Sequence, residues 1–130
     1  MKPNKSKRDN FLDAVQRLAE GVADYHNIPN DTVRDGMIQR FEFTFELAWK
    51  ALKEYMIDAG VQNTLQFPKQ VLREAYAANL ISSETVWLDM LSARNTTSHI
   101  YDDHTAAAIA EKIQKAYLPE LQKLAALFSK

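Results

Sequence analysis

The 130-residue chain contains no cysteine and only three glycines and four prolines. The absence of cysteine excludes disulfide bonds, thiolate zinc sites and a cysteine nucleophile, and it is compatible with a reducing cytosol. With so little glycine and proline, few positions force a regular element to stop. No apolar run approaches the length that spans a membrane, and the basic start is not followed by an apolar signal segment. We therefore expect a cytoplasmic protein.

The chain also lacks an excess of either charge. Sixteen Lys and Arg residues face 17 Asp and Glu residues, which gives a formal net charge of −1. No global field attracts nucleic acid, so any contact with RNA must be local. Hydrophobic residues make up 46% of the chain, a share that is ordinary for globular proteins. This size and composition predict one domain over residues 1–130.

Apolar residues recur at intervals of three and four along most of the chain, the pattern of amphipathic helices. Asn30 or Asp31 can cap the second helix, which Gly60 ends, and Pro68 fits the first turn of a short third helix that Asn79 ends. We predict an all-α fold, an antiparallel up-down bundle of four long helices plus one short helix. The apolar stripes are Phe11, Val15, Leu18, Val22 and Tyr25; Val33, Met37, Phe41, Phe45, Leu52 and Met56; Val71, Leu72, Ala75 and Tyr76; Val86, Trp87, Met90 and Leu91, which form a buried face; and Ile109, Ile113, Tyr117, Leu121, Leu124 and Phe128.

Two of these helices carry unusual features. Residues 41–47 of the second helix alternate with a period of two, as a strand would, but their flanks are helical in composition. In a helix, Phe43, Leu47 and Trp49 fall outside the main stripe, so a second apolar face is expected to meet another subunit, which predicts a dimer. In the last helix, Pro119 is expected to cause a kink or a restart.

A polar segment near the end of the fourth helix gathers the most reactive side chains of the chain. It reads Arg94-Asn95-Thr96-Thr97-Ser98-His99-Ile100-Tyr101. On one unbroken helix, at about 100° per residue, His99 would point roughly 140° away from Arg94. Short polar side chains compete for backbone hydrogen bonds, so we expect the helix to break between Arg94 and His99. That break would bring a guanidinium, an imidazole and a phenol together, before Asp102 or Asp103 caps the last helix.

Such a group suits phosphoryl chemistry. A guanidinium binds phosphate through two parallel hydrogen bonds, and a neutral imidazole exchanges protons near pH 7. We therefore predict Arg94 and His99 as catalytic residues and Tyr101 as a residue that binds substrate or is modified. The supporting polar residues are Asn95, Ser98 and Asp102.

Each member of the group also has an ordinary explanation. Arg94 can be a cation at a helix end, paired with Asp89 or Asp102. His99 can be a capping or surface histidine, and Tyr101 a half-buried ring. Four acidic residues in the neighbourhood weaken phosphate binding. They are Glu84, Asp89, Asp102 and Asp103.

Other signatures of chemistry are missing. His26, His99 and His104 do not have metal-ligand spacing, and no glycine-rich phosphate loop, nucleophile elbow or carboxylate pair is present. Glu46 and Lys50 are explained as an i,i+4 ion pair. We expect neither a metal nor a cofactor.

The spacing Arg94-x4-His99-x-Tyr101, after helical sequence, resembles the signature of the HEPN superfamily and its HepT-like branch. The flanking segments 40–50, 68–75 and 87–91 resemble the group of nucleotidyltransferase substrate-binding subunits. This resemblance implies a dimeric helical bundle with the motif at a shared cleft, and a companion minimal nucleotidyltransferase. In the HepT-like branch it implies a toxin that cleaves RNA without a metal and an antitoxin that silences it by transferring AMP to the motif tyrosine, here Tyr101.

Three functions therefore stay open. The intact motif favours an RNA endonuclease. The near-zero net charge and the second apolar face favour a non-catalytic substrate-binding subunit of a two-component nucleotidyltransferase. The third is a structural dimer in which the motif braces a helix break.

Overall fold

The computed structural model describes residues 6–61, 65–97 and 102–130, and every regular element among them is helical. A π-helical turn, η1, joins the last two helices. The elements are α1 (Lys7–Asn27), α2 (Asp31–Asp58), α3 (Pro68–Ala77), α4 (Glu84–Thr97), α5 (Asp103–Lys112), η1 (Ile113–Tyr117) and α6 (Leu118–Phe128).

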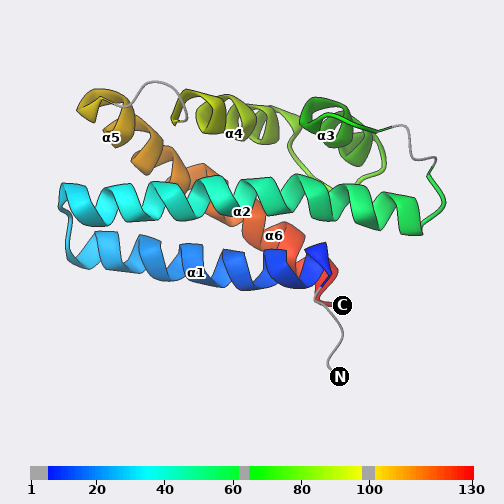
Figure 1. Cartoon of the computed structure of the whole chain (residues 1–130), viewed down its shortest axis with the longest axis horizontal. Coiled ribbons are helices and arrows are strands. Elements are labelled where there is room, and N and C mark those ends of the chain that lie inside the picture. Colours follow the sequence, from blue (N-terminus) through cyan, green and yellow to red (C-terminus); the bar gives the residue numbers. More distant parts are fainter. Residues whose placement is uncertain (1–5, 62–64, 98–101) are drawn as a thin grey trace.

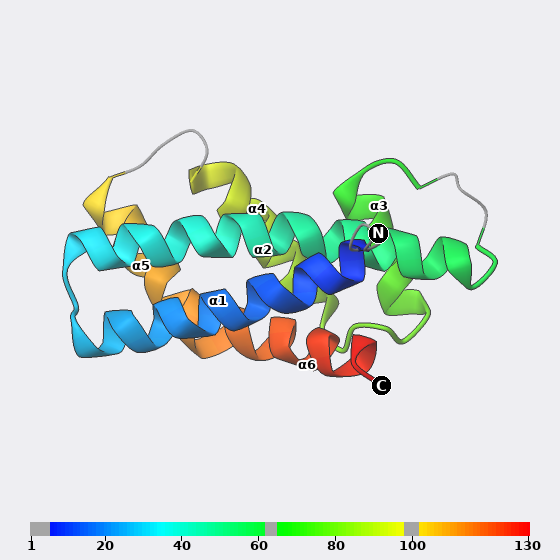
Figure 2. The ribbon, with the colours of Figure 1, turned by 60° about the horizontal axis from the view of Figure 1, so that its bottom comes forward.

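The helices form an antiparallel bundle around the long helix α2. In Figures 1 and 2, α1 runs beside α2 in the opposite direction, while α3 and α4 follow one another along another side of α2. The continuous rod of α5, η1 and α6 crosses behind α2 (Figure 1) and ends beside the start of α1. There the rings of Phe11 and Phe128 meet edge to face at 5.9 Å. The predicted fold of four long elements and one short helix is confirmed, with α5, η1 and α6 as one long element.

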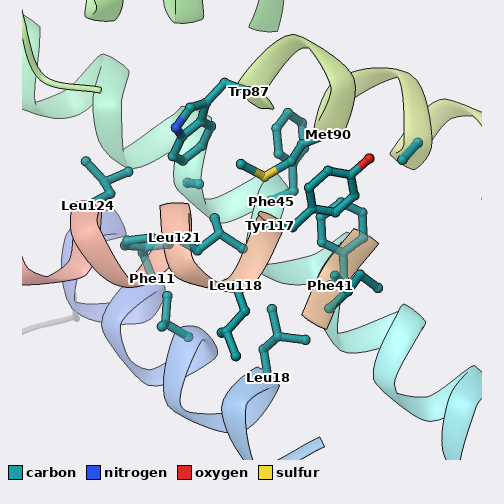
Figure 3. Packing of buried hydrophobic residues seen from close by; sticks show 14 of the residues in the cluster. Phe11, Leu18, Phe41, Phe45, Trp87, Met90, Tyr117, Leu118, Leu121 and Leu124 are labelled. Carbon is teal, nitrogen blue, oxygen red and sulfur yellow. The ribbon is translucent and has the colours of Figure 1, made fainter. Parts of the chain in front are cut away.

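Aromatic rings of α2, α4 and η1 form the centre of the core. Phe41 stacks on Tyr117 with ring centroids 5.1 Å apart, and Phe45 lies 6.3 Å from Trp87 (Figure 3). All four side chains are almost completely buried. Burial of each contributes about 1.5–3 kcal/mol, so this column fixes α4 and η1 against α2.

The helix α2 is confirmed through the stretch that alternates with a period of two. Its main stripe is buried, except that Val33 is only half-buried. Of the three off-stripe residues, Phe43 is 63% exposed, whereas Leu47 and Trp49 are half-buried against the core. The second apolar face is therefore narrower than predicted and is centred on Phe43.

Local signals set the helix ends where the sequence predicts them. The side chain of Asn30 accepts a hydrogen bond from the Val33 amide at 2.8 Å and caps α2. Pro68 lies in the first turn of α3, and Asn79, with φ of 62°, occupies the left-handed region just after that helix. The Ser83 hydroxyl accepts from the Val86 amide and caps α4.

Pro119 restarts the last helix rather than bending it. It lies in the first turn of α6, directly after η1, and the Leu118 amide donates to the Ile113 carbonyl five residues earlier. Proline has no amide hydrogen and crowds the carbonyl four residues before it. The wider π turn accommodates both effects without interrupting the rod.

One buried cation ties the start of α5 to the start of α2. The Arg34 side chain is only 7% exposed and donates to Asp103 at 3.1 Å and to Asp35 at 3.2 Å, with Asp31 at 3.5 Å. Burial opposes the charge on Arg34, but the hydrogen bonds to Asp103 and Asp35 outweigh it and raise its pKa. Since the three carboxylates are largely exposed, most of the stabilisation comes from packing and hydrogen bonds of the guanidinium.

We predict that Arg34→Ala lowers the free energy of unfolding by about 1–3 kcal/mol, because a buried side chain and its hydrogen bonds are lost together. Lys115→Ala is the control, since it removes an exposed i,i+4 pair with Glu111 and should change stability by less than about 0.5 kcal/mol. Urea denaturation followed by circular dichroism measures both. Equal effects of the two substitutions would show that Arg34 does not hold α5 in place.

Candidate functional site

Arg94 lies in the last turn of α4, as predicted. Its side chain is 36% exposed, and its Nη2 atom lies 3.3 Å from Oε2 of Glu46 on α2. A carboxylate at this distance orients the guanidinium. The cation of the motif is therefore held toward α2 while part of it stays accessible to solvent.

Glu46 is the partner that sequence reasoning missed. The expected i,i+4 pair with Lys50 is present, with the Lys50 Nζ atom 3.8 Å from Oε1 of Glu46. The same carboxylate also meets Arg94 through its other oxygen. The two residues are 48 positions apart, so no local spacing could have indicated this contact. The expected alternative partner, Asp89, instead accepts hydrogen bonds from the Tyr117 hydroxyl at 2.5 Å and from Lys112 at 3.2 Å.

The contact between Asp89 and Tyr117 braces α4 from its other side. Burial raises the pKa of Tyr117, and the hydrogen bond to Asp89 and the charge of Asp89 raise it further. The phenol therefore stays protonated and keeps donating to Asp89 throughout the neutral range. The helix that carries Arg94 is thus bound to α2 through Glu46 and to η1 through Asp89.

The helix continues further than predicted after Arg94. Asn95, Thr96 and Thr97 are still helical, so the expected break does not occur among them. The hydroxyl of Thr96 donates to the Ser92 carbonyl and that of Thr97 to the Arg94 carbonyl, each at 3.0 Å. These side chains bond back to the carbonyls of their own helix and do not interrupt it. Any departure from α4 lies after Thr97.

Ser98, His99 and Tyr101 lie outside the described residues. Of the predicted site, the structure therefore places Arg94, Asn95 and Asp102. The meeting of the guanidinium, imidazole and phenol in one pocket stays a prediction.

Asp102 has a structural role as the N-cap of α5. Its Oδ1 atom accepts from the Thr105 amide at 2.7 Å. Hydrogen bonds from the Thr105 amide and hydroxyl, together with the charge of His104, lower the pKa of Asp102. Because the pKa is lowered on folding, this stabilisation is present above the ordinary aspartate pKa and is lost as the pH falls through the folded value. Asp102 thus fixes the start of α5 at Asp103, two positions after Tyr101 in the sequence.

Asn95 and Thr96 line a groove of about 680 Å³ between α3 and α4. The groove adjoins the end of α4 that carries Arg94. Within residues 6–61, 65–97 and 102–130, no three His, Asp or Glu side chains are arranged to hold a metal ion. In the same ranges, no helix is both long and apolar enough to cross a membrane.

Comparison with known proteins places the chain in a family. Residues 6–130 match the family described as nucleotidyltransferase substrate binding protein like. A Haemophilus influenzae protein named probable ribonuclease HepT is 36% identical over 91 residues, which are 67% of this chain and 62% of that relative. The match thus spans less than two thirds of the relative's length.

Two solved structures share the fold. One, from Haemophilus influenzae, is described as the fold of a substrate binding domain of a nucleotidyltransferase; it superposes with a TM-score of 0.81 at 32% identity, covering 93% of this chain and 98% of that one. The other, from Thermus thermophilus, has a TM-score of 0.73 at 28% identity and covers 87% and 99% of the two chains. Since the family match takes in nearly the whole sequence, the chain belongs to the HepT-like family of nucleotidyltransferase substrate-binding proteins.

Proposed function

We propose that the protein is a metal-independent RNA endonuclease, the toxin of a two-gene toxin-antitoxin module. The observation that carries the proposal is the placement of Arg94, a partly exposed guanidinium fixed by Glu46 in the turn of α4 that leads into His99 and Tyr101. The similarity to a protein named probable ribonuclease HepT supports the same function.

In this proposal the ribose of the RNA supplies the nucleophile. His99 takes the proton of the 2′-hydroxyl, the 2′-oxygen forms a bond to phosphorus, and the bond from phosphorus to the 5′-oxygen breaks. The leaving 5′-oxygen takes up a proton from solvent, and the product ends in a 2′,3′-cyclic phosphate. Arg94 binds the phosphate and stabilises the negative charge that grows on its oxygens. Glu46 is a positioning residue, because it acts through Arg94.

We further propose that two copies of the chain assemble through the exposed face of α2 around Phe43. A phenyl ring exposed to 63% on the longest helix of the bundle is the supporting observation. The companion would be a minimal nucleotidyltransferase that silences the nuclease by transferring AMP to Tyr101. The Tyr101 oxygen would attack the α-phosphate of ATP, pyrophosphate would leave, and the phenolic proton would pass to solvent. The added anion would repel RNA from the site.

A second candidate is a non-catalytic substrate-binding subunit of a two-component nucleotidyltransferase. The family description and the description of the solved Haemophilus influenzae fold favour it. The two functions differ in one observable, which is whether the chain alone cuts RNA.

We predict that Arg94→Ala and His99→Ala each lower the rate of RNA cleavage by about 10²–10³-fold, because one removes charge stabilisation and the other a proton acceptor. The rate is measured with a labelled oligoribonucleotide in the presence of a chelator. His104→Ala is the matched control, since it removes an exposed histidine five residues later. Oligodeoxyribonucleotide, which lacks the 2′-hydroxyl, should stay intact. If the wild-type chain leaves RNA uncut, the substrate-binding function holds instead.

We predict that incubation with the companion nucleotidyltransferase and ATP adds whole AMP units to this chain, and that Tyr101→Phe abolishes the gain. Tyr76→Phe is the control, because Tyr76 is 45% exposed on α3 and the same hydroxyl is removed at a position outside the motif. This variant should gain AMP as the wild type does. Intact mass spectrometry measures the gain, and native spectra of the same samples report the assembly, for which we expect a dimer. Modification that persists in Tyr101→Phe would move the acceptor to another residue, and a monomeric mass would contradict the proposed dimer.

A further inference from the structure

The groove between α3 and α4 has two walls of different chemistry. Lys69 and Arg73 of α3 form one wall. Leu88 and Leu91 of α4 supply an apolar surface, and Ser92 and Asn95 add a hydroxyl and an amide beside it. A volume of about 680 Å³ lies within the range of ligand sites and exceeds what one bound water needs.

The described contacts give Lys69 and Arg73 no role in stabilising the fold. Both side chains are exposed, and neither belongs to an ion pair within the described part of the chain. Like charges at the i,i+4 spacing repel one another and weaken a helix. Glu74, the nearest carboxylate in sequence, lies about 100° around α3 from Arg73. The wall therefore presents concentrated positive charge in a chain whose net charge is −1.

The spacing of the cations suits a nucleic-acid strand. Residues four apart on a helix are about 6 Å apart along its axis, which is comparable with the separation of neighbouring phosphates in an extended strand. Leu88 and Leu91 offer an apolar surface that a base can cover, and the Asn95 amide can donate to or accept from the edge of that base. Tyr76 follows Arg73 by three positions on the same face of α3, and its ring is 45% exposed, so a further base can stack there.

The groove reaches the same end of α4 that carries Arg94. Asn95 lines the groove and directly follows Arg94, while Leu91 lies one turn before Arg94 on α4. If Arg94 binds the scissile phosphate, the rest of the strand reaches the groove by crossing the last turn of α4.

We propose that the α3–α4 groove holds the single-stranded RNA beside the cleavage site, with Lys69 and Arg73 on its phosphates and the leucine surface under a base. This inference rests on the proposed endonuclease function, and it assigns the substrate as an unpaired strand that extends beyond the bond that is cut.

The test measures binding separately from cleavage. All variants carry His99→Ala, so that the probe, a fluorescein-labelled oligouridylate of about twelve nucleotides, stays intact. Fluorescence anisotropy gives the affinity at several salt concentrations. The double substitution Lys69→Gln with Arg73→Gln is expected to weaken binding about tenfold. It should also make the slope of log K against log salt concentration less steep by about 0.7 for each cation removed. The control is Lys115→Gln with Lys130→Gln, which removes the same charge from exposed positions outside the groove and should change affinity less than twofold.

The outcomes separate this inference from the function on which it rests. If the Lys69→Gln, Arg73→Gln variant binds the probe more weakly and the control variant does not, the groove is supported as the binding site, even if the wild-type chain cuts no RNA. Equal binding by both double variants overturns the groove, even if wild type cleaves through Arg94 and His99. If AMP or inorganic phosphate displaces the probe completely at micromolar concentration, the groove is a mononucleotide or phosphate site and the strand proposal fails. Circular dichroism of each variant confirms folding, which exposed side chains on α3 should leave unchanged.

Discussion

The packing of aromatic rings along α2 is the constraint on which the rest of the structure depends. Phe41 and Phe45 hold Tyr117 of η1 and Trp87 of α4 against the same helix. Because η1 continues α5, one support is shared by α4 and by the rod of α5, η1 and α6, which lie on either side of the polar segment in the sequence. Polar contacts then set both ends of that segment on α2, through Glu46 with Arg94 and through Arg34 with Asp103. Their anchors on α2 are 12 residues apart, a rise of about 18 Å. The end of α4 and the start of α5 are therefore placed relative to each other by a single rigid helix.

The fold gives the acidic residues near the polar segment roles of their own. The four acidic residues that weaken phosphate binding in the sequence have other tasks in the fold. Glu84 lies in the first turn of α4, where a negative charge suits the helix dipole, and Asp89 binds Tyr117 and Lys112. Asp102 caps α5, and Asp103 binds Arg34. With these carboxylates engaged, Lys69 and Arg73 of α3 form a positively charged wall in a chain with almost no net charge.

The sequence predicts the helices well because their signals are local. Asn30, Pro68 and Asn79 act within one turn of their own position, and the apolar stripes repeat with the helical period. The sequence does not predict the pairs of Arg34 with Asp103 or Glu46 with Arg94, because residues 69 and 48 positions apart meet only after the bundle forms. It also ends α4 too early, because threonine hydroxyls can bond to their own helix as well as interrupt it. Arg94 lies in the last turn of α4 and Asp102 caps α5, but that Arg94, His99 and Tyr101 form one site stays a prediction.

If Arg94 and His99 face one pocket, the Arg94 guanidinium affects the titration of the His99 imidazole, which NMR measures. A guanidinium beside the ring disfavours the imidazolium, so the pKa of His99 should be higher in Arg94→Ala than in the wild type. Equal pKa values of His99 in the wild type and in Arg94→Ala would contradict the claim, because the two groups would then not lie together within a subunit or across a dimer.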